Sequence, residues 1–122
     1  MPRRAAVRSA DRIIRLTGPT PPAGADVSDT ESVDAAFIEI EKTWGPVDVV
    51  VANAGVLTAG TWDTTTSEQW RTVVDVNLIG TWNTCAAALP HMQDRGGSLI
   101  NISSAAGLKG TPLHLPYTAS KH

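Results

Sequence analysis

The sequence has little cysteine, no long apolar run and no large excess of charge of either sign. Its single cysteine, Cys85, excludes an internal disulfide and leaves no cysteine cluster to bind a metal. The longest apolar stretches, such as residues 47–52, are far shorter than the ~20 residues of a membrane-spanning helix. The formal net charge of −2 gives no general attraction to nucleic acid. We therefore expect a cytoplasmic protein with no metal, no membrane partner and no nucleic-acid partner.

Length and composition indicate one folded domain. The 122 residues are 42% hydrophobic and 18% charged, which is ordinary for a globular protein and argues against disorder. A chain of this length supports one hydrophobic core and is too short for two domains.

The N-terminal segment differs from the rest in charge and pattern. Half of the ten basic residues fall within the first fifteen positions: Arg3, Arg4, Arg8, Arg12 and Arg15. An arginine-rich start is compatible with a transit peptide or a nucleic-acid-binding arm. No clean period is present, however, and residues 18–22 (Gly-Pro-Thr-Pro-Pro) break any regular element. We favour an irregular segment over residues 1–24, with the folded domain over residues 25–122.

From Ser28 onward the apolar pattern becomes periodic. Residues 28–31 (Ser-Asp-Thr-Glu) read as a capping box for a helix that Gly45-Pro46 ends. Residues 47–52 and 98–103 are short and mostly apolar, as in strands buried on both faces of a parallel sheet. A Gly/Thr-rich loop over residues 54–66 follows the first of these strands.

Two further helices complete the pattern. One begins at Thr66, with Gln69 as its capping partner, and the other begins at Pro116. The inner face of the first is predicted to hold Trp70, Val73, Val74, Asn77, Leu78, Trp82, Cys85, Ala88 and Leu89. The alternation of helices and strands predicts an α/β fold, a partial Rossmann-type doubly wound parallel sheet that holds only its central strands and helices.

A tyrosine and a lysine four positions apart, Tyr117 and Lys121, project from one face of the last helix. A phenol is a poor base at neutral pH, and a cation held close to it favours the phenolate. The pair would then serve as a proton donor and acceptor. Taken alone, the same spacing is also common on an ordinary solvated helix face.

Polar and small residues follow both predicted strands. Ser104 comes after the second strand, thirteen residues before Tyr117, and Asn53-Ala54-Gly55 follows the first. The carboxyl ends of parallel strands share the sheet edge at which open α/β folds bind ligands. Small residues there allow a cofactor to approach the backbone, although either segment alone could be a simple turn. Asn77 lies on an apolar helix stripe, where a buried amide must be paired.

Five segments together resemble the single-domain type of the short-chain dehydrogenase/reductase family. They are Asp26-Val27, Val51-Ala52-Asn53-Ala54-Gly55, Asp75-Val76-Asn77-Leu78, Asn101 to Gly107, and Tyr117-Thr118-Ala119-Ser120-Lys121. Their order and separations also match, over residues 25–122. The likeness is greatest to bacterial members linked to the redox cofactor mycofactocin, including carveol-dehydrogenase-like proteins. Ala52 stands where the commoner family form has a second asparagine.

The resemblance implies an oxidoreductase that transfers hydride between NAD(P), with NAD favoured, and a secondary alcohol or ketone. Tyr117 would be the general acid/base, Lys121 would favour its phenolate and bind the nicotinamide ribose, and Ser104 would orient the substrate oxygen. Asn77 would hold a water that passes the proton on. Adenine contacts are implied for Asp26 and Val27, and contacts on the adenosine side for Asn53, Ala54 and Gly55. The complete enzyme is expected to be a dimer or tetramer.

The sequence departs from the family at both ends. No glycine fingerprint for the pyrophosphate precedes Asp26. The residue that selects NAD or NADP therefore cannot be assigned, and Asp11 and Arg12 are the candidates for what is left of that region. The chain stops one residue after Lys121, which leaves a last helix too short to be stable alone. We therefore expect a fragment that, by itself, neither binds NAD(H) tightly nor turns over alcohols.

Two alternatives stay open. One is a non-catalytic remnant of a truncated dehydrogenase gene, which flanking DNA with the glycine motif or a continuation past His122 would reveal. The other is a relative of sugar-nucleotide epimerases and dehydratases, against which Asn77 and Ser103-Ser104 argue. The substrate is not predictable, although residues 56–65 and 108–115 are expected to border its pocket. His91 and His114 have no partner at metal-ligand spacing and are expected to be ordinary surface residues.

Overall fold

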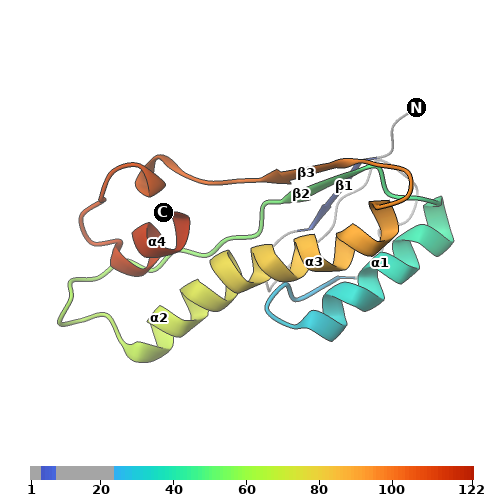
Figure 1. Ribbon diagram of the computed structural model, residues 1–122. Helices are drawn as coiled ribbons and strands as arrows, with labels where there is room; N and C mark the ends of the chain where they lie inside the picture. Colours follow the sequence, from blue (N-terminus) through green and yellow to red (C-terminus); the bar gives the residue numbers. More distant parts are fainter. Residues whose placement is uncertain (1–3, 8–23) are drawn as a thin grey trace.

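The computed structural model describes residues 4–7 and 24–122. Within these residues, three parallel strands form a sheet in the order β1-β2-β3: β1 (Arg4–Val7), β2 (Val49–Ala52) and β3 (Ser98–Asn101) (Figure 1). The parallel sheet with its helices confirms the predicted Rossmann-type α/β fold.

Strand β1 is a finding that the sequence pattern did not predict, because residues 1–24 were expected to be irregular. Its backbone pairs with β2 in register, Arg4 opposite Val49 and Val7 opposite Ala52. The proposed break at residues 18–22 and the candidates Asp11 and Arg12 lie outside the described residues.

Helices make up most of the remaining described residues. They are α1 (Thr30–Trp44), α2 (Ser67–Val74), the π-helix η1 (Asp75–Ile79), α3 (Gly80–Met92), the 3₁₀-helix η2 (Ala105–Gly107) and α4 (Leu115–Lys121). α2, η1 and α3 follow one another without a gap and form one long rod, and α1 and α3 lie side by side on the same face of the sheet (Figure 1). None of the described helices is long and apolar enough to cross a membrane.

The helix starts are set by side-chain caps, one of which differs from the prediction. α1 is capped by Asp29, whose carboxylate accepts from the Glu31 amide at 3.1 Å, so the prediction of Ser28 as the cap is wrong. The Ser28 hydroxyl instead donates to Asp26 Oδ1 at 2.7 Å. The box at the start of α2 is confirmed: Thr66 Oγ1 accepts from the Gln69 amide at 3.1 Å, and Gln69 Oε1 accepts from the Thr66 amide at 2.9 Å.

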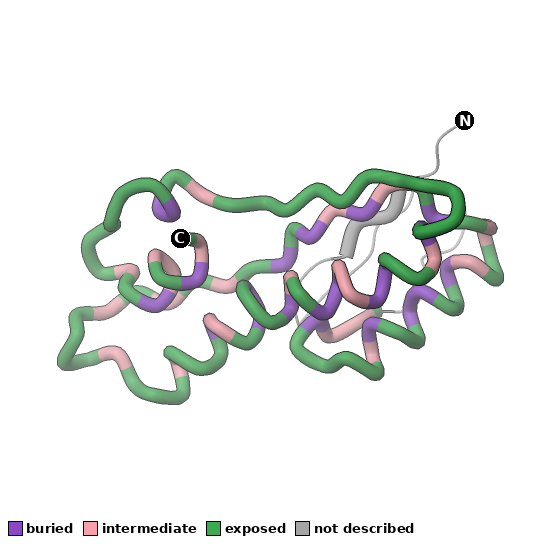
Figure 2. The backbone as a smooth tube through the Cα atoms, in the orientation of Figure 1, coloured by how far each residue is buried: buried purple, intermediate pink, exposed green. Residues whose placement is uncertain are grey.

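The hydrophobic core lies between the sheet and the facing sides of α1 and α3 (Figure 2). Its members include Val27, Val33, Phe37, Ile40, Val47, Val50, Val76, Ala87, Ala88 and Met92. α3 approaches the chain before α1 so closely that a Cβ on Gly80 would lie 2.6 Å from Val27 Cγ2. No side chain fits at this contact, and the buried face of α3 continues with Asn83, Thr84, Ala87 and Ala88 before it ends at Met92.

Larger apolar residues of the rod point to solvent, contrary to the predicted inner face. Trp70, Leu78, Trp82 and Leu89 are all exposed, Trp82 by 69%. The prediction that residues 98–103 form a strand buried on both faces is also wrong, because all four residues of β3 are exposed. β3 lies at the edge of the three-stranded sheet, and α3 packs against its neighbour β2 instead.

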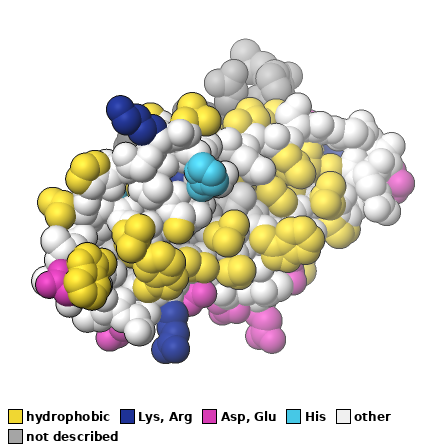
Figure 3. Space-filling view, turned by 60° about the vertical axis from the view of Figure 1, so that its left-hand side comes forward, with side chains coloured by type: hydrophobic (Ala, Val, Ile, Leu, Met, Phe, Trp, Pro, Cys, Tyr) yellow, Lys and Arg dark blue, Asp and Glu magenta, His cyan; other side chains and the backbone are white. Residues whose placement is uncertain are grey.

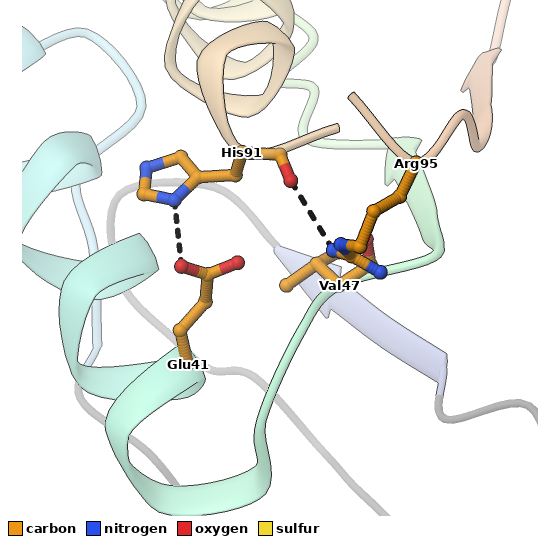
Figure 4. A network of polar contacts seen from close by, with 4 residues as sticks. All are labelled: Glu41, Val47, His91 and Arg95. Carbon is orange, nitrogen blue, oxygen red and sulfur yellow. Dashed lines mark hydrogen bonds and ion pairs between the residues drawn. The ribbon is translucent and has the colours of Figure 1, made fainter. Parts of the chain in front are cut away.

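A polar network ties the end of α3 to α1 and to the segment before β2 (Figure 4). His91 Nδ1 lies 2.7 Å from Glu41 Oε2, and the imidazole stacks on Phe37 with ring centroids 5.7 Å apart. The Arg95 guanidinium donates to the carbonyl oxygens of His91 and Val47, at 3.2 and 3.4 Å. His91 is thus a half-buried link between two helices, and its prediction as an ordinary surface residue is wrong.

Candidate active site

One cavity of about 470 Å³ opens where β2 and β3 end, between the segments that follow these strands and α4. Its lining comes from Asn53, Gly55, Val56 and Leu57 after β2, from Ile102, Ser103, Ser104, Ala105, Ala106, Thr111 and His114 after β3, and from Tyr117 and Lys121 of α4. This is the carboxyl edge of the parallel sheet, where the sequence predicted a ligand site.

Five of the predicted site residues meet in this cavity: Ser104, Tyr117, Lys121, Asn53 and Gly55. They come from three separate stretches of the chain, so their meeting is a property of the tertiary fold. α4 contributes its two residues from one side because Tyr117 and Lys121 are one helical turn apart.

The Ser104 hydroxyl has a defined hydrogen-bonding role that leaves its proton available. Ser104 is the N-cap of η2, and its Oγ accepts a hydrogen bond from the Ala106 amide at 3.2 Å. A hydroxyl that accepts from the backbone retains its own O–H for donation. The cap therefore holds Ser104 at the cavity wall with a donor to offer to a ligand oxygen.

Lys121 brings a positive charge to the wall of the cavity beside Tyr117. The Lys121 Nζ atom lies 5.9 Å from the centroid of the Tyr117 ring and donates a hydrogen bond to the Ile102 carbonyl at 2.9 Å. Both side chains are half-buried. The Lys121 ammonium and the Tyr117 ring are thus neighbours in the lining of the cavity.

Asn77 lies behind the cavity and holds its wall in place. It is 3% exposed and sits in the π-helix η1. Its Oδ1 accepts from the Val56 amide at 2.8 Å, and its Nδ2 donates to the Val56 carbonyl at 3.0 Å and to Ser120 Oγ at 2.9 Å. Both Nδ2 hydrogens are thus engaged by protein atoms. The paired amide expected from the sequence is confirmed, whereas its water-holding role stays a prediction.

Three predicted cofactor contacts lie outside this cavity. Asp26 uses Oδ1 to accept from the Ser28 amide, at 2.9 Å, and from the Ser28 hydroxyl. The Val27 side chain is fully buried in the core, so any contact of Val27 with adenine has to come from its backbone. Ala54 is also a core residue. Their roles toward adenine and adenosine stay predictions.

His114 lines the cavity and was missed by the sequence reasoning, which placed it on the ordinary surface. The loop that carries it is fixed by a bridge to the segment after β2, in which the Gly60 amide donates to the Leu113 carbonyl at 2.8 Å. Leu113 adopts a left-handed φ of 66°, an uncommon conformation for a bulky residue. The sequence analysis expected residues 108–115 to border the pocket. This range includes His114, so the place of His114 in the lining could have been predicted from it.

Comparison with known proteins places the chain in a family. The family model described as short chain dehydrogenase matches residues 5–122. An uncharacterised NAD-dependent oxidoreductase of Mycobacterium tuberculosis is 46% identical over 99 residues, and the (-)-trans-carveol dehydrogenase of Rhodococcus erythropolis is 42% identical over 101 residues. Each match covers 80% of this chain. The chain belongs to the short-chain dehydrogenase family.

A solved structure supports the same assignment. The gluconate 5-dehydrogenase of Burkholderia cenocepacia, crystallised with NADP and tartrate, superimposes with a TM-score of 0.76 at 36% identity. The match covers 81% of this chain and 39% of that protein. The chain likewise spans 36% of the length of the two curated relatives. The predicted resemblance, including that to carveol dehydrogenase, is confirmed.

Proposed function

We propose that residues 25–122 supply the reactive part of an NAD(P)-dependent oxidoreductase that interconverts a secondary alcohol and a ketone when the enzyme is complete. The observation that carries the proposal is the meeting of Ser104, Tyr117 and Lys121 in one cavity at the carboxyl edge of the sheet. A hydroxyl donor, a phenol and a fixed cation are the groups needed to orient an alcohol oxygen and move its proton.

Each of the three side chains has a separate role at the substrate oxygen. In alcohol oxidation, Tyr117 Oη takes the hydroxyl proton while the Lys121 ammonium stabilises the charge on the phenol. The Ser104 O–H, which the Ala106 cap leaves free to donate, holds the oxygen in place. In ketone reduction Tyr117 returns the proton to the same oxygen. Asn77 would bind a water that connects this proton path to solvent.

The cavity is proposed to hold the nicotinamide side of a dinucleotide cofactor, with the adenine side beyond it. Gly55 faces the space beside the cation, where an added Cβ would lie 3.5 Å from Asn77 Oδ1 and 3.7 Å from Lys121 Nζ. The absence of a side chain keeps this space open for a ligand. Asp26 and Val27 would hold the adenine, Asn53, Ala54 and Gly55 the adenosine side, and Tyr117 and Lys121 the nicotinamide ribose. The cofactor, when bound, supplies the hydride acceptor or donor.

The expected cofactor is NAD, and the expected substrate is an alicyclic or similarly apolar secondary alcohol. The relative from Mycobacterium tuberculosis, which is named as NAD-dependent, supports the choice of cofactor. Apolar Val56, Leu57 and Ile102 in the lining, together with the resemblance to carveol dehydrogenase, support the choice of substrate. We expect the enzyme in the cytoplasm.

A homo-oligomer, as a dimer or tetramer, is the proposed assembly. Exposed apolar residues of the rod (Trp70, Leu78, Trp82 and Leu89) contribute to the hydrophobic surface of the molecule, and a space-filling view shows a broad hydrophobic area on one side (Figure 3). In the assembled enzyme, Trp82→Glu should shift the sedimentation coefficient from that of the oligomer to that of a monomer. Trp62, which is 84% exposed on a loop, provides the control variant Trp62→Glu, which should leave the assembly unchanged.

A chimera tests the chemistry directly. Residues 25–122 replace the matching segment of the Rhodococcus carveol dehydrogenase, and oxidation of alicyclic alcohols is followed at 340 nm with NAD and with NADP. We expect turnover that Tyr117→Phe lowers by at least ~100-fold, the usual contribution of a general acid/base. A folded chimera without turnover would contradict the proposal and favour the non-catalytic remnant.

For the 122-residue chain alone, the expectation is neither tight NAD(H) binding nor turnover. Titration with NADH, followed by its fluorescence, measures this. A saturable enhancement that is lost in Tyr117→Phe or Lys121→Ala would overturn this expectation.

A further inference from the structure

We propose that Ser103 and Gly107 are positioning residues that fix Lys121 in the cavity, and that the adjacent serines therefore have separate tasks. Ser104 faces the ligand, whereas Ser103, which lines the same cavity, holds the end of α4. The consequence for catalysis rests on the proposed function, but the positioning itself is a property of the folded chain.

The first contact is a hydrogen bond to the last turn of α4. Ser103 Oγ donates to the backbone carbonyl of Lys121 at 3.0 Å. The bond joins the segment that follows β3 directly to the backbone of Lys121.

The second contact is a close approach that only glycine allows. A Cβ on Gly107 would lie 2.0 Å from the Lys121 carbonyl oxygen and 2.8 Å from its carbonyl carbon. Both atoms belong to the backbone, so neither can move aside without displacing the helix end. The same Cβ would lie 3.1 Å from Ser103 Oγ, which shows that the two contacts are parts of one arrangement.

The side chain of Lys121 is anchored to the same segment. Its Nζ donates to the Ile102 carbonyl at 2.9 Å, next to the residue whose hydroxyl holds the Lys121 backbone. Residues 102–107 therefore hold Lys121 at both ends. A shift of the helix end would move the ammonium relative to Tyr117, which is one turn earlier in the same helix.

Lysine labelling tests the arrangement without any need for turnover. The chain has three lysines, and exposed Lys42 and Lys109 serve as internal references for half-buried Lys121. The purified 122-residue chain is treated with a limiting amount of an acylating reagent. Mass spectrometry then gives the acylation rate of each of the three lysines. We expect Lys121 to react more slowly than Lys109. Ser103→Ala should raise its rate by about fivefold, the factor that one hydrogen bond contributes.

Matched variants separate positioning from general loss of structure. Gly107→Ala should raise the Lys121 rate at least as much, whereas Gly110→Ala, with nothing within 4 Å of its added Cβ, should leave it unchanged. Ser103→Thr, which keeps the hydroxyl, should leave the acylation rate of Lys121 as slow as in the unsubstituted chain. Ser104→Ala should leave the Lys121 rate as it is.

The outcomes distinguish this inference from the proposed function. Equal rates for Lys121 and Lys109 in the unsubstituted chain, or an unchanged Lys121 rate in Ser103→Ala, would overturn the positioning role. Should the labelling pattern hold while Ser104→Ala leaves turnover of the chimera intact, the proposed function fails and the positioning role stands.

Discussion

Asn77 and Ser120, 43 positions apart in the chain, share a buried hydrogen bond in which Asn77 Nδ2 donates to Ser120 Oγ at 2.9 Å. The Ser120 hydroxyl in turn donates to the Tyr117 carbonyl at 2.8 Å. This short chain of bonds joins the π-helix in the long rod to α4, and Asn77 also binds the backbone of Val56 behind the cavity. The wall of the site and the helix that carries Tyr117 are thus held by one amide.

Replacing this amide should destabilise the whole site region. In Asn77→Leu, the Val56 amide and carbonyl and the Ser120 hydroxyl lose a partner. Since an unsatisfied buried polar group costs about 1–3 kcal/mol, we expect the free energy of unfolding to fall by at least that amount. Urea denaturation followed by tryptophan fluorescence measures the change. Gln93→Leu, the same kind of change at an exposed amide, is the control and should change the free energy little. A stability of Asn77→Leu equal to that of the control would contradict the anchoring role.

Gly80→Ala tests the close packing of α3 on the chain before α1. Alanine is favoured over glycine in a helix by about 1 kcal/mol, but its Cβ would lie 2.6 Å from Val27 Cγ2 and 3.0 Å from Val27 Cβ. Valine is stiff at χ1 and fully buried here, so the overpacking cost of about 1–3 kcal/mol should outweigh the gain in propensity. We expect a lower melting temperature.

The double variant Gly80→Ala/Val27→Ala provides the internal control for this packing. Shortening Val27 removes Cγ2, the nearest atom that the new methyl group meets, so Gly80→Ala should cost less in the Val27→Ala background. Additive effects of the two substitutions on the free energy of unfolding would show that the contact is not the cause.

His114 should influence substrate affinity more than the chemical step. It lines the cavity but contributes no group that the proton transfer needs. In the carveol dehydrogenase chimera, His114→Ala is expected to change KM for alicyclic alcohols by about tenfold, which corresponds to one contact of 1.4 kcal/mol, with kcat within a few-fold. His122→Ala, at an exposed position outside the lining, is the control. A selective loss of kcat would instead place His114 in the proton path.

Cys85 should react with thiol reagents at a higher pH in the folded chain than in the unfolded one. Partial burial raises the pKa of the Cys85 thiol above its ordinary value of 9.0, and its Sγ donates to Asn101 Oδ1 at 3.3 Å. Because only the thiolate is nucleophilic, alkylation by iodoacetamide at pH 8 should be slower in buffer than in urea.

The same shift of the pKa sets the sign of the effect on stability. The fold favours the protonated thiol, so this contribution is complete below the ordinary pKa and is lost as the pH rises through the raised value. Cys85→Ser removes the labelling and, with it, this part of the pH dependence. Equal alkylation profiles for folded and unfolded chains would contradict the prediction.

Local signals carried the prediction of secondary structure and of most of the site. The Thr66–Gln69 box and the Gly45 stop depend on residues close together in the chain, and both are observed. The meeting of Ser104, Tyr117 and Gly55 followed from one rule, that parallel strands place their carboxyl ends on a single edge. The prediction of the buried helix face was wrong where both faces of a helix carry apolar residues. The pattern favoured large residues such as Trp82, which is exposed, whereas the close contact at Gly80 leaves no room for a side chain.

The sequence by itself determined the family and the order of helices and strands from α1 onward, and it selected Ser104, Tyr117 and Lys121 as the candidate trio, because each depends on short motifs and their spacing. Only the tertiary structure decided which side chains hold that trio. The bonds from Asn77 to Ser120 and from Ser103 to the Lys121 carbonyl join segments 43 and 18 positions apart. No pattern along the chain encodes such pairs, since they form only when packing of the rod, the strand ends and α4 brings the partners within hydrogen-bond distance.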